Sequence, residues 1–192
     1  MKTRMFAILL CLLSLSGCGG KSEPIPLEDL PEDYSLEQAK EDGCLVTENG
    51  TVTSGREAWE KFLKAADAGK SASVRLCSYY TLDDPSRYDP DYYESIKDDD
   101  PMMFLRDLSY DGERFTTVSY EEGQRYEESY SLLRQREETV QSTGVKIVQY
   151  IITDDAETSL EKIYAQLYSS TFSPEGGIPF ATVYQEFIPP EG

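Results

Sequence analysis

The stretch that does most to decide the fold runs from Ser54 to Gly69 and reads SGREAWEKFLKAADAG. Its apolar side chains recur three and four residues apart, which is typical of a helix with one buried face; they are Trp59, Phe62, Leu63 and Ala66. We predict a helix over residues 55–68, begun by a capping box of Ser54 and Glu57 and ended by Gly69. Trp59 is then a core residue, and the helix covers a sheet.

Strand patterns on both sides of this helix supply the sheet. Residues 71–81 alternate between two faces, with Val74 and Leu76 on one and Cys77 on the other. Residues 145–153 are apolar on both faces, which favours a central strand. Other strands are expected over residues 44–47, 51–53, 103–110, 113–121, 124–138 and 180–187. Asn-Gly at 49–50, Asp-Gly at 111–112 and Glu-Gly at 122–123 favour tight turns between them.

Two further helices complete the fold prediction. Ser35 and Gln38 form a capping box before a short helix that ends at Gly43. Asp155 can cap a helix over residues 156–169. We therefore predict an α+β protein, with a twisted, mainly antiparallel sheet, two or three helices packed on it, and a single domain over residues 35–192.

The first eighteen residues have the layout of an export signal. Lys2 and Arg4 precede an apolar run of about ten residues, which is too short to span a hydrocarbon core of about 30 Å. The run closes on Leu-Ser-Gly before Cys18, which resembles the lipobox of bacterial lipoproteins. We predict a signal peptide over residues 1–17 and a lipid-modified Cys18 that anchors an extracytoplasmic protein to the membrane. Residues 18–34, rich in Gly, Pro and acidic side chains, are expected to form a flexible tether.

Charge and composition narrow the choice of function. The 36 acidic and 18 basic residues give a net charge of −18, and such a surface repels nucleic acid. The absence of histidine removes the commonest general base and most catalytic zinc sites, so we expect no enzyme. Cys44 and Cys77 are candidates for a disulfide outside the cytoplasm, with two buried thiols as the alternative.

An acidic, tyrosine-rich segment interrupts the strand pattern over residues 82–101. Its candidate binding residues are Asp83, Asp84, Tyr88, Asp89, Asp91, Tyr92, Tyr93, Asp98, Asp99 and Asp100. The carboxylates suggest calcium as a candidate cofactor, although the spacing of a calcium-binding loop is missing. The tyrosines suggest instead a loop that contacts a protein or glycan partner. We predict a solvated, partly ordered loop and assign it no firm metal site.

Several of these motifs together resemble a known group of proteins. They are residues 34–43 (YSLEQAKEDG), 49–52 (NGTV), the helix to Gly69-Lys70, the strand to Tyr80-Thr81, and residues 108–112 (LSYDG). Over residues 34–121, and more loosely to 153, the chain is similar to small Firmicutes cell-surface lipoproteins whose function is unknown. The resemblance implies an envelope location and an α+β fold, and it implies no catalytic residue. The acidic segment 83–101, Cys44 and the C-terminal helix depart from that group.

The sequence thus favours a membrane-tethered, non-catalytic binding module with a protein or glycan partner in the cell envelope. A hydrolase that uses two carboxylates is one alternative, because this chemistry needs no histidine. An envelope protein that responds to calcium or to redox state is the other.

Overall fold

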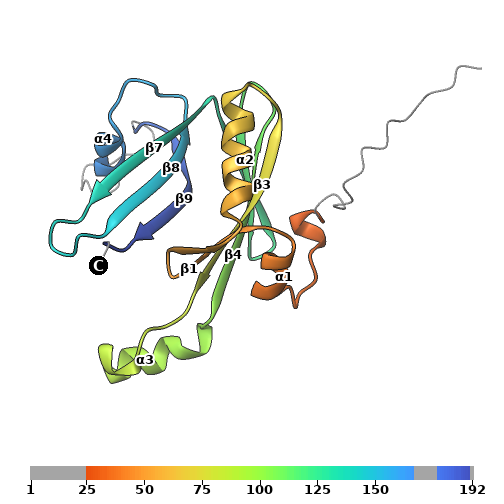
Figure 1. Cartoon of the computed structure of the whole chain (residues 1–192). Helices are drawn as coiled ribbons and strands as arrows, with labels where there is room; N and C mark the ends of the chain where they lie inside the picture. Colours follow the sequence, from red (N-terminus) through yellow and green to blue (C-terminus); the bar gives the residue numbers. More distant parts are fainter. Residues whose placement is uncertain (1–24, 167–176, 191–192) are drawn as a thin grey trace, which may run out of the picture.

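The computed structural model describes residues 25–166 and 177–190, which fold into two sheets with helices packed on them (Figure 1). The larger sheet has the strand order β2-β1-β3-β4-β5-β6 and the smaller has the order β7-β8-β9. The strands are β1 (Leu45–Glu48), β2 (Thr51–Ser54), β3 (Ala72–Tyr80), β4 (Met102–Tyr110), β5 (Phe115–Glu121), β6 (Gln124–Tyr130), β7 (Leu132–Thr139), β8 (Lys146–Thr153) and β9 (Phe180–Ile188). The α-helices are α1 (Leu36–Glu41), α2 (Arg56–Asp67), α3 (Pro90–Ile96) and α4 (Leu160–Ala165), and the short 3-10 helices are η1 (Leu27–Asp29), η2 (Pro85–Arg87) and η3 (Lys97–Asp99).

The predicted α+β class is confirmed, although the strands form two sheets in place of one. The strand pairs are antiparallel except for β1 with β3, which are parallel because β2 and α2 return the chain between them. Strand β8 is the central strand of the smaller sheet, as its two apolar faces predicted.

Helix α2 lies between the two sheets and provides the shared core. Its Trp59 and Phe62 side chains are buried, which confirms the amphipathic pattern. They pack on Val74 and Leu108 of the larger sheet, and the same core continues into Ile152 of the smaller one. Figure 1 shows the helix with one sheet on either side. Because one core joins both sheets, the protein has a single body.

The turns and one of the two predicted caps agree with the sequence. Asn49 and Gly50 both have positive φ in the tight turn between β1 and β2. At α1 the Ser35 hydroxyl accepts from the Gln38 N–H while the Gln38 side chain accepts from the Ser35 N–H, so this capping box is confirmed.

The capping box predicted at Ser54 and Glu57 is wrong. The N-cap of α2 is Gly55, with φ of 73° and no side-chain cap. A Cβ at this position would lie 1.9 Å from the carbonyl oxygen of Cys44, so the close passage of that strand requires glycine here.

The long strand predicted over residues 124–138 divides at Ser131, and its halves belong to different sheets. Tyr130 and Leu133 both pack on the core around α2. In an unbroken strand, residues three apart point to opposite faces, so the chain must shift by one residue between them. Ser131 makes this shift, and its N–H is held by the Asp154 carboxylate at 2.7 Å.

The last helix begins later than predicted. Asp155 does not cap the helix directly. Its carboxylate accepts from the N–H groups of Glu157 and Thr158, and these bonds form a turn that precedes the helix. Helix α4 therefore begins at Leu160, and it packs on Ile151, on the face of the smaller sheet opposite α2. Residues 167–169 of the predicted helix lie outside the described residues.

The tether predicted over residues 18–34 is ordered from Ile25 onward. The Ile25 carbonyl accepts a 2.7 Å hydrogen bond from Arg75, which also forms two hydrogen bonds to Asp107. Tyr34 packs beside the cluster around Cys44. These contacts fix residues 25–34 against the larger sheet, while residues 18–24 lie outside the described residues.

Candidate functional site

The acidic segment, predicted as a partly ordered loop, is a short helical excursion at the end of an arm formed by β3 and β4 (Figure 1). Three of its seven aspartates accept hydrogen bonds from local backbone N–H groups. Asp84 accepts from the Ser86 N–H, and Asp89 accepts from the N–H groups of Asp91 and Tyr92 at the start of α3. Asp100 accepts from the Leu82 N–H, which closes the excursion. These three carboxylates therefore shape the segment.

The remaining predicted residues of the excursion divide into surface charges and an aromatic cluster. Asp83 pairs with Arg87 at 2.9 Å, and Asp91, Asp98 and Asp99 are exposed. The Tyr88 ring lies in tilted contact with the rings of Tyr92 and Tyr93, with centroids 6.3 and 5.9 Å apart, and Tyr92 is 57% exposed. The tyrosines are thus brought together on the arm, whereas no three of the carboxylates form a metal-binding group within residues 25–166 and 177–190.

Cys44 and Cys77 are free thiols in the structure rather than a disulfide. They lie in the same buried cluster with Ala39 and Val46. The parallel register places Cys77 opposite Val46, two residues beyond Cys44. Two residues along a strand and one strand spacing across give a Cα separation of about 8 Å, which exceeds the roughly 7 Å limit of a disulfide. The register therefore explains why the thiols stay separate.

We expect both thiols to react slowly in the native chain. Burial raises the pKa of Cys77 to about 12 and raises that of Cys44. Since the thiolate is the nucleophile, the reaction of Cys77 with a disulfide reagent at pH 8 should be about a thousandfold slower than in denaturant. Residues 18–192 carrying Cys18→Ser should show two thiols on unfolding without reductant. Finding none would mean that a disulfide forms.

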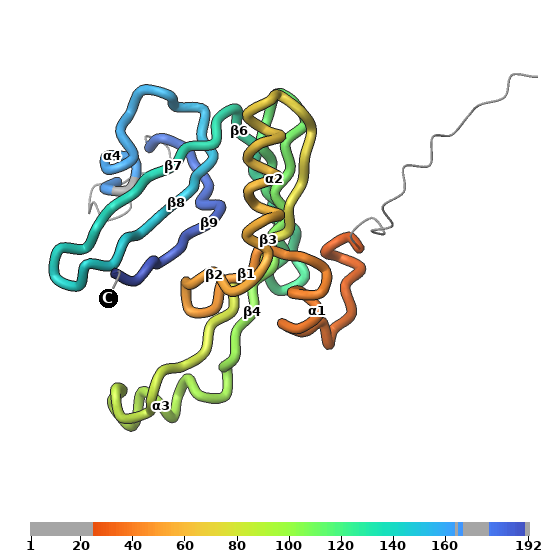
Figure 2. Tube along the Cα trace, viewed as in Figure 1, coloured from red at the N-terminus to blue at the C-terminus, as the bar shows by residue number. Residues whose placement is uncertain are grey.

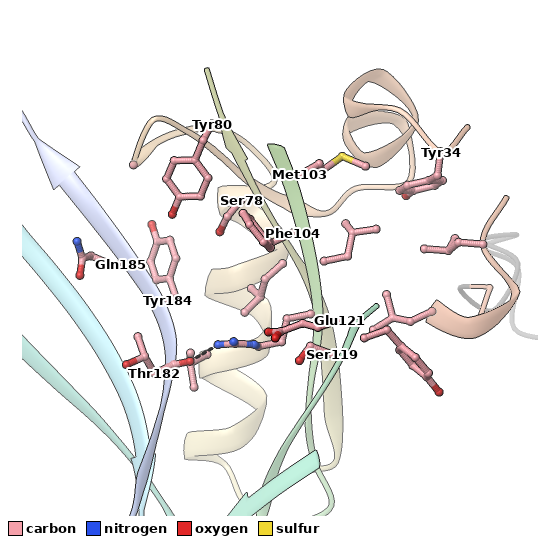
Figure 3. A pocket seen from close by; sticks show the side chains of 18 of the residues that line it. Tyr34, Ser78, Tyr80, Met103, Phe104, Ser119, Glu121, Thr182, Tyr184 and Gln185 are labelled. Carbon is pink, nitrogen blue, oxygen red and sulfur yellow. Dashed lines mark hydrogen bonds between the residues drawn. The ribbon is translucent and has the colours of Figure 1, made fainter. Parts of the chain in front are cut away.

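A groove of about 650 Å³ opens between the two sheets and is the strongest candidate site (Figure 3). One wall is the edge of β9, from Thr182 to Phe187. The other is the start of β4, from Met103 to Arg106, with Ser78 and Tyr80 of β3 beside it. Beyond the β4 edge the groove continues to the N-terminal segment around Leu30 and Pro31. It therefore curves around one strand.

Exposed apolar side chains gather beside this groove. Phe104 is 51% exposed, Met102 is 44% exposed and Tyr80 is 41% exposed. The ring centroids of Tyr80 and Phe104 are 6.0 Å apart, and Figure 3 shows both rings on the side that faces β9. Large apolar side chains that gather at a concave surface are typical of a binding site.

Two hydrogen bonds to backbone carbonyl groups bridge the sheets next to the groove. The Arg106 guanidinium donates to the Thr182 carbonyl of β9 (Figure 3), and burial lowers the pKa of Arg106. The Phe187 N–H donates to the Gly50 carbonyl at 2.7 Å. A Cβ at Gly50 would lie 2.2 Å from the Phe187 ring, so the turn approaches β9 closely. These contacts connect the walls of the groove.

Below the groove, a buried carboxylate ties the smaller sheet to α2. Glu186 is 5% exposed and accepts from the Tyr184 hydroxyl at 2.8 Å and from Arg56. Burial, followed by the bond to Glu186, raises the pKa of Tyr184 far above its usual range. Tyr184 stays protonated and donating, so this cluster positions the groove wall.

The carboxyl groups with shifted pKa values do not supply the general acid of a hydrolase. Such an acid needs a raised pKa. Among the described residues, the carboxyl pKa values that depart from their usual range are all lowered: Glu48, Asp84, Asp111, Asp154, Asp155 and Glu161. The leading cause is a side-chain bond from Lys40 for Glu48 and backbone N–H donors for the others.

Sequence reasoning missed the groove residues. Phe104, Arg106 and Tyr184 lie on strands that were predicted, but they meet only through the arrangement of the two sheets. The one available signal was the run Met102 to Leu105, four apolar residues without the alternation of a half-exposed strand.

Comparisons with protein-family models, with curated proteins and with solved structures find no match to this chain. Within residues 25–166 and 177–190, no helix has the length and apolar character needed to cross a membrane. Cys18 lies outside the described residues. The site is therefore interpreted from its own geometry.

Proposed function

We propose that this chain is a lipid-anchored, extracytoplasmic binding protein that holds a partner in the groove between β9 and β4. Over residues 34–121, and more loosely to 153, it resembles the small envelope lipoproteins of unknown function. Acylation of Cys18 would hold the protein at the membrane, since its acidic surface is repelled by anionic headgroups. The ordered domain then presents the groove to the extracytoplasmic space.

The observation that carries this proposal is the exposure of Tyr80, Met102 and Phe104 beside a groove of about 650 Å³. Leaving three large apolar side chains in water is unfavourable by roughly 25 cal/mol for each Å² of apolar surface. A partner that covers them recovers this free energy. The protein is proposed to bind its partner without transforming it.

A photo-reactive amino acid at Phe104 of the anchored chain in cells tests the proposal. Irradiation should give a discrete cross-linked product, because Phe104 lies in the proposed interface. The same amino acid at Lys64, on the exposed face of α2, is the matched control and should give none. A third variant, with the photo-reactive amino acid at Tyr92, tests whether the partner also contacts α3.

A second measurement tests the anchor. Cys18→Ala should move the protein from the membrane fraction to the soluble extracytoplasmic fraction. Equal cross-linking at Phe104 and Lys64 would contradict binding in the groove. Full retention of Cys18→Ala in the membrane fraction would contradict the lipid anchor.

A further inference from the structure

Strand β4 is only half covered by its neighbours. It pairs with β3 along its whole length, from Met102 to Tyr110, but its pairing with β5 covers only Arg106 to Tyr110. Strand β5 continues to Glu121 along β6 and leaves β4 behind. Figure 2 shows β3 and β4 running on together toward α3. In the described part of the chain, no strand pairs with the outer edge of residues 102–105.

The direction of the free backbone groups follows from the turn between β4 and β5. The Asp111 N–H donates to the Arg114 carbonyl at 3.2 Å, so Asp111 directs its backbone groups toward β5. These directions alternate along a strand, and the β4 registers show no shift. Met103 and Leu105 therefore direct their N–H and C=O groups into the groove.

This edge lacks the features that usually prevent strands from pairing with it. Natural edge strands carry charged side chains, proline or a bulge, because an open row of N–H and C=O groups is a template for another strand. Between Pro101 and Arg106 the edge of β4 reads Met-Met-Phe-Leu over residues 102–105, with no charge and no proline among these four residues. Such an edge is suited to accept a strand.

Side chains on both faces of the larger sheet border this edge. Phe104 and Tyr184 lie on the α2 side of the groove, whereas Leu30, Pro31 and Tyr34 lie on the opposite side. Successive side chains of an added strand point to opposite faces. One set would contact the aromatic side and the other the N-terminal segment, so apolar residues at successive positions of the strand would each contact one side of the groove.

The charges beside the groove indicate the chemistry of the added strand. Glu32 and Glu121 line the groove and are exposed, and the whole chain carries a net charge of −18. Two copies of such a chain repel each other, which opposes pairing of one β4 edge with another. A strand that carries Lys or Arg is attracted.

We propose that the partner binds by strand addition: an extended, basic polypeptide segment pairs through its backbone with Met103 and Leu105 of β4. Its apolar side chains contact Phe104 on one face and the N-terminal segment on the other. The mode is known in general for peptides that extend a sheet. This inference rests on the proposed function, since it specifies what the groove holds.

The experiment uses the full chain, purified with its anchor in detergent, and a library of random dodecapeptides. Selected peptides should carry apolar residues at successive positions, flanked by Lys or Arg. Each is then synthesised with its alternate backbone nitrogens methylated in one register or in the other. Methylation of the N–H groups that face β4 should weaken binding at least tenfold, and the other register should weaken it less than threefold.

Variants of β4 provide the matching test on the protein. Met103→Pro removes an N–H that faces the groove and leaves the hydrogen bonds to β3. Met103→Ala removes the same side chain and keeps the N–H, so the difference between the two variants measures the backbone contribution. We expect Met103→Pro to bind at least tenfold more weakly than Met103→Ala. Lys64→Ala on α2 should bind as the natural chain does.

Three results would overturn strand addition. The first is a selection that enriches no peptide. The second is a set of peptides that bind equally well with either methylation register. The third is a dimer of the natural chain that dissociates in Met103→Pro, since the occupant would then be a second copy. A specific cross-link at Phe104 alongside any of these results would leave the binding function standing and remove only the strand.

Discussion

Replacing Trp59 by alanine is expected to lower the free energy of unfolding by about 4 kcal/mol. The indole is 3% exposed and contacts aromatic rings on three elements. Its centroid lies 5.6 Å from Phe62 on α2, 4.9 Å from Tyr150 on β8 and 5.3 Å from Tyr184 on β9. Removing it would leave a cavity where the helix meets the smaller sheet.

Thermal unfolding followed by circular dichroism measures this effect. A loss of about 4 kcal/mol corresponds to a fall in Tm of roughly 8 to 16 °C for a domain of this size. Lys64→Ala, on the exposed face of the same helix, should change stability by less than about 0.5 kcal/mol. If Trp59→Ala were equally mild, α2 would not lie between the sheets.

Replacing Glu186 by alanine is expected to cost about 3 kcal/mol. The buried Tyr184 hydroxyl would lose its acceptor, and Arg56 would lose its partner. The cost stays below that of a fully buried ion pair because the Arg56 side chain is 50% exposed and can be hydrated. Urea unfolding gives the free energy directly.

A double-mutant cycle separates the two partners of Glu186. In a Tyr184→Phe background there is no hydroxyl to leave unsatisfied, so Glu186→Ala should cost at least 1 kcal/mol less. Glu186→Gln keeps an acceptor and should fall between the natural chain and Glu186→Ala. Strict additivity of Tyr184→Phe and Glu186→Ala would show that the hydroxyl and carboxylate do not interact.

Much of the fold could be predicted because the deciding signals are local. The capping box at Ser35 and the turn at Asn49-Gly50 act within a few residues, and the buried face of α2 is a simple periodicity. The cap at Ser54 failed because the path of Cys44 past Gly55, a tertiary contact, determines that helix start.

The groove could not be predicted because it depends on where pairing stops. The apolar run from Met102 to Leu105 is a signal of unusual exposure, but it does not indicate that β5 departs at Arg106, since register is set between strands. The structure of the excursion was missed for another reason. Its aspartates were interpreted as ligands or solvated charge, whereas Asp84 and Asp89 cap short helices.

The joint at Ser131 fixes the length of the chain between the sheets. Because Tyr130 and Leu133 both face the same core, the alternation of side chains between the two faces is interrupted at Ser131. If the shift at Ser131 is kept, one inserted residue would turn Leu133 outward, together with every second residue of β7. Insertions should therefore be tolerated in the hairpin before β6 and not at this joint. The placement of one sheet against the other thus depends on the number of residues at Ser131.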